Sequence, residues 1–178
     1  MSDLVDDIIH EWRELRPDLD FSPLEVVSRL LRVAHYLQSR LDDVAAAYGL
    51  SHTGDLDVLT DLDRAGPSHE RTPTELAEAQ LLTAGGMTVR LNRLQAAGLI
   101  ERRPNPDDGR GVLVRLTPLG RDLAEDALAT LLDTQASGIR GLKTPDRAIL
   151  ARLLRDLLVA LGDTPAFRPR LVVKRPAR

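Results

Sequence analysis

A helix pattern followed directly by two strand patterns, within residues 83–120, constrains the fold of this chain more than any other feature. Apolar residues in its first part recur at steps of four and three, the spacing of a helix with one buried side: Met87, Leu91 and Leu94. Thr83 is suited to cap the start of this helix, and Gly98 tolerates the left-handed conformation that often ends one. The sequence therefore predicts a helix over residues 84–97.

Two short strands joined by a polar turn are expected after this helix. Leu99 and Ile100 lead into the first strand, residues 105–109 are turn formers, and residues 112–116 alternate like a half-buried strand. Before the helix, residues 72–75 (Thr-Pro-Thr-Glu) have the capping-box spacing that starts a shorter helix. Two helices joined by a turn and followed by a hairpin form a winged helix-turn-helix.

The charge of this region fits contact with DNA phosphates. Residues 83–121 contain seven arginines and three acidic residues, a local net charge of +4, although the whole chain carries −3. A basic region on an acidic protein favours phosphate binding, while the acidic remainder limits unspecific adhesion. Each neutralised phosphate releases counterions, so binding to duplex DNA should weaken steeply as the salt concentration rises.

The outward face of the 84–97 helix is also readable from the sequence. At about 100° per residue, five residues lie opposite the buried face: Gly85, Val89, Asn92, Arg93 and Ala96. Gly85 and Gly86 leave room for a DNA backbone or base edge to approach, and Arg90 sits on the shoulder of the helix. Taken alone, this element also fits an ordinary amphipathic surface helix; the adjoining hairpin favours the DNA-reading interpretation.

The remaining helix patterns indicate a scaffold around this unit. Helices over residues 3–16 and 22–48, and two more after residue 117, carry more apolar surface than one winged-helix unit covers. A two-fold dimer with intertwined terminal helices would bury it and present two recognition helices to adjacent major grooves. We expect a mainly α fold with a small β-hairpin wing, in four parts: 1–50, an added helix and the first dimerisation helix; 51–118, the winged helix-turn-helix; 119–162, the C-terminal dimerisation helices; 163–178, a basic flexible tail.

Composition argues against other classes of function. The chain has no cysteine, and its four histidines lie far apart without the spacing of a zinc site. Gly85-Gly86 is not a phosphate-binding loop, because no strand precedes it and no Gly-Lys-Ser/Thr follows. We expect no enzyme activity, no metal and no cofactor. With no apolar run approaching 18 residues and no signal peptide, we expect a cytoplasmic protein without membrane contact.

The stretch from residue 76 to residue 120 resembles the MarR family of bacterial transcriptional regulators. Three motifs carry this resemblance: GGMTVRLNRLQAAGLIERR, the wing-tip Asp108-x-Arg110, and Leu116-Thr117-x-x-Gly120 before the next helix. The resemblance implies a homodimer on a pseudo-palindromic site, with the 84–97 helix in the major groove. It also implies that Arg110 reaches the minor groove and that Asp108 orients it through a charge-assisted hydrogen bond.

The helix face and the resemblance together give a set of expected DNA contacts. These are Thr83, Gly85, Gly86, Thr88, Val89, Asn92, Arg93, Arg103, Asp108 and Arg110. Val89 departs from the polar residue common at its position in the urate-responsive branch described next, a difference that bears on operator preference.

The front of the chain resembles a narrower, urate-responsive, PecS-type branch of that family. The added helix with its tryptophan, then RPDLDFSPLEVVSRL, then GDLDVL carry this resemblance. The branch places four residues around an anionic purine between the dimerisation and DNA-binding lobes, which here are Trp12, Asp57, Arg90 and Arg102. Arg103 competes with Arg102, because strand alternation alone does not decide between neighbours.

A flat anion suits an indole and guanidinium groups, which are planar and delocalised. The alternative for these residues is a tryptophan that latches the first helix, a solvated Asp57 and two phosphate-binding arginines. The sequence thus predicts a DNA-binding regulator, a repressor released by urate or a related anion. Two alternatives stay open: a DNA-binding regulator without a small ligand, and a winged-helix module that binds other proteins.

Overall fold

The computed structural model describes residues 2–106 and 108–164, and for residues 108–110 it describes the backbone only. The fold is mainly helical with a small antiparallel sheet. In chain order, the elements are α1 (Leu4–Leu15), α2 (Ser22–Ala47), α3 (Thr53–Asp63), β1 (Glu70–Arg71), α4 (Pro73–Ala79), α5 (Ala84–Ala96), β2 (Ile100–Asn105), β3 (Asp108–Leu116), α6 (Pro118–Gly138) and α7 (Thr144–Ala160). The expected basic tail, residues 163–178, lies outside the described residues from 165 onward.

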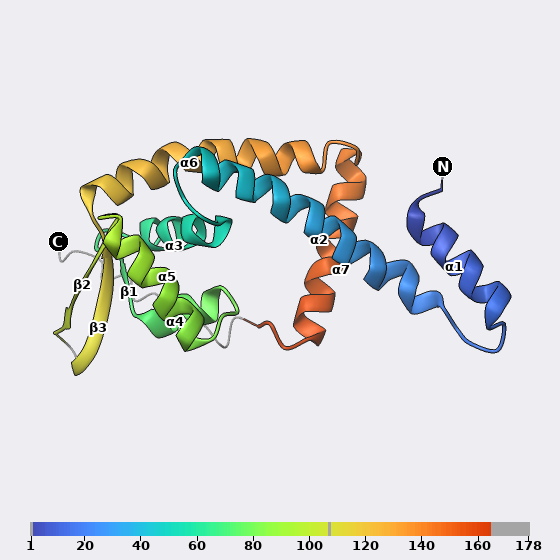
Figure 1. The fold of residues 1–178 in the computed structure, drawn as a ribbon, viewed down its shortest axis with the longest axis horizontal. Helices are drawn as coiled ribbons and strands as arrows, with labels where there is room; N and C mark the ends of the chain where they lie inside the picture. The colour runs from blue at the N-terminus through green and yellow to red at the C-terminus, as the bar shows by residue number, and fades with distance from the viewer. Residues whose placement is uncertain (1, 107, 165–178) are drawn as a thin grey trace, which may run out of the picture.

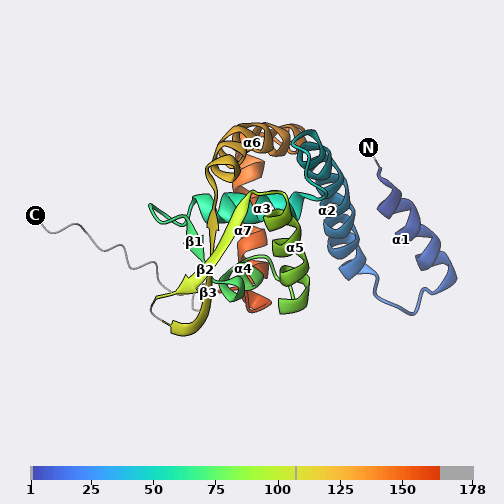
Figure 2. The same ribbon diagram turned by 60° about the vertical axis from the view of Figure 1, so that its left-hand side comes forward.

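The helix-turn-helix and its wing form one compact lobe. Elements α3, α4, α5 and the sheet gather at one end of the molecule, whereas α1 lies at the other end (Figure 1). Helices α2 and α6 run across the molecule above the lobe, and α7 descends beside them (Figures 1 and 2). The mainly α fold with a winged helix-turn-helix is therefore confirmed.

The wing has one strand more than the sequence predicted. The strand order is β1-β3-β2, and β3 pairs antiparallel with both neighbours, with Ile100 opposite Leu116 and Glu70 opposite Arg115. Residues 66–71 begin with the turn formers Gly66 and Pro67 and show no strand pattern, yet the last two form β1. A two-residue strand is too short to show an alternating pattern, so only the pairing with β3 reveals it.

Three threonines start helices as expected. The Thr72 hydroxyl accepts the Glu75 N–H at 3.2 Å in a complete capping box. The Thr83 and Thr117 hydroxyls accept the N–H groups of Gly86 and Gly120, each at 3.1 Å, and so cap α5 and α6. The start of α2 differs: Ser22 is already helical, and the Asp20 carboxylate accepts its backbone N–H at 2.9 Å. The same carboxylate also accepts the Ser22 hydroxyl at 2.9 Å, so this hydroxyl does not cap the helix.

The core of the lobe is centred on α3. Leu56, Leu59 and Leu62 are fully buried there, against Met87 and Leu91 of α5. Burying side chains of this size typically stabilises a fold by roughly 1.5–3 kcal/mol each, so the lobe has a core within a single chain.

Gly120 fixes the junction between the wing and α6. A Cβ at this position would overlap the backbone carbonyl oxygen of Leu99, so only glycine allows α6 to approach the end of α5 this closely. The Thr117 hydroxyl donates to the carbonyl of Gly98 at 2.7 Å and stabilises the same junction.

Helix α1 packs against the first half of α2 and runs antiparallel to it. The Arg29 guanidinium donates to Asp3 at 2.8 Å and to Asp6 at 2.5 Å, while Arg13 donates to Glu25 at 3.0 Å. Pairing of the start of α1 with Arg29 and of its end with Glu25 sets this direction.

The apolar face of α7 is uncovered. None of its residues is buried, and Leu153, Leu157 and Leu158 are all exposed. Among the described residues, no helix is both long and apolar enough to cross a membrane.

Candidate DNA-binding surface and ligand pocket

The outward face of α5 is open, as its sequence predicts. Met87, Leu91 and Leu94 point into the core. The expected contacts along the other side of the helix are exposed: Thr83, Gly85, Gly86, Thr88, Val89 and Asn92. Space is free around the Cα of Gly85, and the Val89 side chain is 63% exposed. This face can therefore approach another surface closely.

Arg93 makes an internal contact in place of an outward one. Its Nε donates to Asp55 Oδ2 at 2.9 Å and its Nη2 to Asp55 Oδ1 at 2.5 Å, a two-pronged ion pair between α5 and α3. Asp55 is only 1% exposed, and its hydrogen bonds raise the pKa of Arg93 above the ordinary value. A carboxylate this deeply buried requires such a partner, so Arg93 sets how α5 sits on α3.

Our sequence reasoning missed Asp55, although the signal was present. Asp55 precedes Leu59 by four residues and Leu62 by seven, which puts it on the buried face of α3. A charged residue on an apolar helix face predicts a buried partner. Asp61, on the same helix, is also buried: it is 4% exposed and pairs with Arg64 at 2.5 Å.

The two neighbouring arginines of β2 point in different directions. Arg102 donates to the side-chain oxygens of Asn92 at 2.8 Å and Gln95 at 2.9 Å, both on α5. Arg103 instead pairs with Glu70 of β1. Both arginines therefore brace the wing. The expected wing-tip pair, Asp108 and Arg110, lies on β3, and their side chains are outside the described residues.

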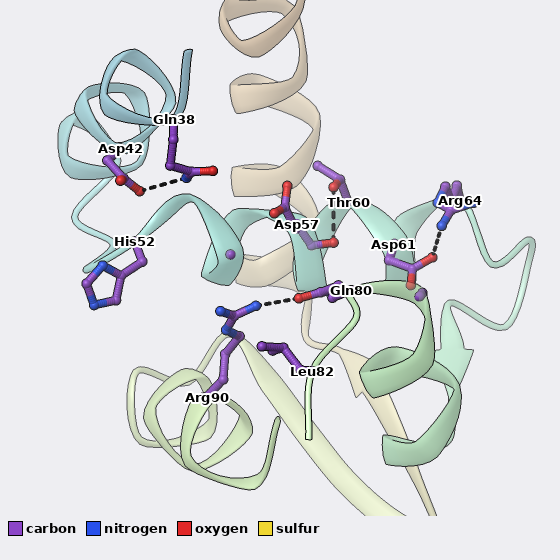
Figure 3. Close-up of a pocket in the computed structure, with 12 residues that line it drawn as sticks. Gln38, Asp42, His52, Asp57, Thr60, Asp61, Arg64, Gln80, Leu82 and Arg90 are labelled. Carbon is purple, nitrogen blue, oxygen red and sulfur yellow. Dashed lines mark hydrogen bonds and ion pairs between the residues drawn. The ribbon is translucent and has the colours of Figure 1, made fainter. Parts of the chain in front are cut away.

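A pocket of about 550 Å³ lies between the scaffold and the DNA-binding lobe. Its lining comes from the second half of α2, from α3 and from the α4–α5 region (Figure 3): Gln38, Asp42, His52, Gly54, Asp57, Thr60, Asp61, Arg64, Ala79, Gln80, Leu82 and Arg90. Two of the four expected ligand residues, Asp57 and Arg90, thus meet in one pocket. It adjoins the shoulder of α5, as the sequence predicted for Arg90.

Arg90 is held in this pocket by partners on two other elements. Its guanidinium donates to the Gln80 side-chain oxygen in the α4–α5 turn (Figure 3). Its Nε lies 3.8 Å from Asp55 Oδ1. A Cβ at Gly54 would overlap the guanidinium, so the glycine makes room for Arg90 across the start of α3. Asp55 Oδ1 thereby faces both Arg90 in the pocket and Arg93 on α5.

Two pocket carboxylates differ in their electrostatic setting. Although much of the Asp57 surface is exposed, the surrounding protein displaces water and raises its pKa above the ordinary 3.8; Arg90 opposes this, and Asp42 and Asp61 add to it. The pKa of Asp42 is lowered, because the backbone N–H and the hydroxyl of Thr53 donate to it at 2.8 and 2.7 Å.

The other two expected ligand residues do not line this pocket. Trp12 lies on α1, 46% exposed, with its ring stacked on Phe21 at a centroid distance of 6.1 Å. Arg102 contacts the outer side of α5. Of the expected quartet, a single chain therefore brings only Asp57 and Arg90 to the pocket, which Arg64, paired with Asp61, also lines. Among the described residues, the pocket lining contains no aromatic side chain apart from the His52 imidazole. Within the part of the chain that the structure describes, no group of three or more potential metal ligands is clustered.

Comparisons with known proteins agree with this architecture. The MarR family model matches residues 48–111. The transcriptional regulator PecS of Dickeya dadantii is 34% identical over 86% of this chain and 95% of its own length. The crystal structure of a mutant E. coli MarR, complexed with operator DNA, is 28% identical and covers 88% of this chain and 99% of that one, with a TM-score of 0.67. Sco5413 of Streptomyces coelicolor, 25% identical, covers 84% of this chain and all of its own, with a TM-score of 0.71. The chain therefore belongs to the MarR family of transcriptional regulators.

Proposed function

We propose that this chain is a ligand-responsive DNA-binding regulator, a repressor that acts in the cytoplasm as a homodimer on a pseudo-palindromic operator. A small anionic ligand, urate or a related purine, releases it from DNA. The observation that carries the ligand response is the pocket that brings Asp57 and Arg90 together beside the recognition helix. The operator-bound MarR structure supports the DNA-binding part.

The DNA-reading surface is the exposed face of α5 with the wing beside it. Thr83, Gly85, Gly86, Thr88, Val89 and Asn92 enter the major groove, and Asp108 and Arg110 at the wing tip serve the minor groove. Arg103, on the wing, lies near the DNA backbone. Arg93 contributes by holding α5 at a fixed angle through Asp55.

Dimerisation follows from the uncovered scaffold. Isolated soluble chains rarely expose long contiguous apolar surfaces, yet α7 and parts of α2 and α6 do. A two-fold partner that covers these faces would place two α5 helices at a fixed separation, as an inverted repeat requires.

The ligand acts through Arg90. A planar anion that binds this guanidinium competes with Gln80 and Asp55, the two groups that tie Arg90 to the turn before α5 and to α3. Arg90 and Arg93 share the Asp55 carboxylate, so a change at Arg90 also alters how α5 is positioned on α3. A ligand shifts an equilibrium only through its different affinity for two states; here it favours the state in which Arg90 has left its partners.

One observation favours a second candidate, a DNA-binding regulator without a small ligand. Arg90 already has protein partners, while Trp12 and Arg102 lie outside the pocket of their own chain. In that case the pocket arginine is a structural brace.

Titration separates the two candidates. The protein is bound to a duplex that it has itself selected from random sequences, and urate, xanthine and a phenolic acid are added at fixed salt concentration. We expect urate to weaken DNA binding and Arg90→Ala to abolish this response. Unchanged DNA affinity with all three compounds would contradict the ligand response and favour the second candidate.

A further inference from the structure

We propose that Trp12 of one chain completes the ligand pocket of a second copy, so that each ligand site is built from two chains. This inference rests on the proposed function, because it takes Trp12 as part of the ligand site. What it adds is the chain that provides the indole.

The position of α1 separates Trp12 from the pocket of its own chain. The ion pairs of Arg29 with Asp3 and Asp6 fix α1 along the first half of α2, and Trp12 stacks on Phe21, just before α2 begins. The pocket instead starts at Gln38, in the second half of the same helix.

The length of α2 gives the separation between Trp12 and the pocket of its own chain. Phe21 and Gln38 are 17 residues apart, which corresponds to about 25 Å along a helix that rises 1.5 Å per residue. Figure 1 shows α1 at the opposite end of the molecule from α3 and α5, and in Figure 2 α2 stands between α1 and these two helices. To reach its own pocket, α1 would have to give up its ion pairs with Arg29 and its packing on α2.

Helix α1 also has a second apolar side, which the described part of the chain leaves largely exposed apart from the stacking of Trp12 on Phe21. Val5 and Ile9 are buried against the body of the chain. Another stripe at helical spacing is exposed to solvent: Leu4, Ile8, Trp12 and Leu15. A helix with two apolar sides and one neighbour requires a second surface to pack against, and Trp12 lies within the uncovered side.

A second copy of this chain is the partner that fits. The bare face of α7 shows that the scaffold is incomplete as a monomer. In the dimer that we propose, the two-fold axis lies across the long direction of the scaffold, so that the two chains run in opposite directions. The α1 end of one chain then lies toward the DNA-binding lobe of the other.

The pocket lacks what Trp12 would bring. Ala79 and Leu82 are the apolar members of its described lining, and the other members are polar, charged or glycine. A planar purine gains from stacking on an aromatic ring and from a guanidinium in the same site. Arg90 supplies the second of these from within the chain, and the partner's indole supplies the first.

Mixed dimers test the arrangement. Two differently tagged chains are co-expressed, one with Trp12→Ala and the other with Arg90→Ala, and the dimer carrying both tags is purified. If Trp12 acts across the dimer, this species has one intact site, formed by Arg90 of the first chain and Trp12 of the second. We expect calorimetry to show one urate site per mixed dimer and greatly weakened binding in either variant homodimer.

The matched control pairs a chain carrying both substitutions with an unsubstituted chain. Here the two-chain arrangement leaves no intact site, whereas a site built within one chain leaves one. One site in this control and none in the first mixed dimer would overturn the proposal, as would unchanged urate affinity in the Trp12→Ala homodimer. Absence of urate binding by the unsubstituted dimer would contradict the proposed function itself.

A second measurement does not depend on the ligand. Because the chain has no cysteine, Trp12→Cys in one tagged chain and Thr60→Cys in the other provide a single cross-chain pair. We expect a short bis-maleimide to link the two chains into a covalent heterodimer. If the link forms only within a chain that carries both cysteines, the placement of Trp12 across the dimer is wrong, whatever the ligand proves to be.

Discussion

The DNA-binding lobe and the helical scaffold of this chain differ in how far one chain completes them. In the lobe, Leu56, Leu59 and Leu62 of α3 are fully buried in one cluster with residues of α5 and the sheet. In the scaffold, α7 buries none of its residues, and α1 keeps one apolar stripe exposed. One chain is enough to bury the core of the lobe, whereas the scaffold needs a partner to cover its exposed apolar faces. The pocket lies between the two, where a ligand can affect how one sits on the other.

Breaking the scaffold should have the largest effect on DNA binding. With Leu157→Glu, a charge on the exposed apolar face of α7 opposes its burial, so we expect a folded monomer in analytical ultracentrifugation. Losing the second recognition helix removes an avidity gain of roughly 10²–10⁴ in affinity. Arg152→Gln, an exposed change on the same helix, is the control and should stay dimeric. A dimer with unchanged DNA affinity from Leu157→Glu would show that α7 is not at the interface.

Breaking the lobe should cost stability. Asp55→Ala leaves Arg93 without its buried partner, and loss of one member of a buried pair costs about 3–5 kcal/mol. Because Arg93 is partly exposed, we expect a loss near the lower end, about 3 kcal/mol, in urea unfolding. Asp57→Ala, two residues along the same helix, is the matched control and should change stability little. Equal losses from the two variants would argue against a special role for Asp55.

The exposed face of α5 should be dispensable for folding and needed for DNA. Val89→Glu places a negative charge on a residue that is 63% exposed, so we expect an unchanged unfolding midpoint. DNA affinity should fall by about tenfold or more, since a lost major-groove contact costs roughly 1–3 kcal/mol. The same substitution at the exposed loop residue Ser68 controls for added charge. Equal DNA affinity in both variants would remove Val89 from the DNA surface.

The smallest effects are expected from the two pocket aspartates, with opposite signs. The raised pKa of Asp57 means that folding disfavours its charged form, so Asp57→Asn should slightly stabilise the protein at pH 7. The lowered pKa of Asp42 means the reverse, so Asp42→Asn should destabilise it. The Asp57 difference should disappear as the pH falls toward the ordinary value of 3.8, whereas the Asp42 difference should be lost only as the pH falls below it. Urea midpoints at neutral and acid pH measure this, and shifts of the same sign would contradict the assigned environments.

Local signals predicted the lobe well from the sequence. Threonine caps at Thr72, Thr83 and Thr117 are short-range features, and the structure contains all three. The position of Arg90 on the shoulder of α5 follows from helix geometry alone, and in the structure Arg90 lines the pocket.

Features that depend on distant contacts were harder to predict. Strand β1 exists because β3 pairs with it, and the role of Arg93 depends on Asp55, 38 residues earlier in the chain. Similarly, the resemblance placed Trp12 at the ligand, whereas the packing of α1 on α2 decides how far it lies from the pocket of its own chain. Sequence spacing defines faces of helices, but it does not say which face meets which.

The most direct test of the account is the affinity for operator DNA at fixed salt concentration, with and without urate, for the unsubstituted dimer and for Arg90→Ala. We predict that urate weakens DNA binding of the unsubstituted dimer by about tenfold, within the usual range of allosteric coupling, and leaves Arg90→Ala unaffected. Equal DNA affinity of the unsubstituted dimer in both conditions, or an undiminished urate response in Arg90→Ala, would contradict the claim that this pocket controls the recognition helix.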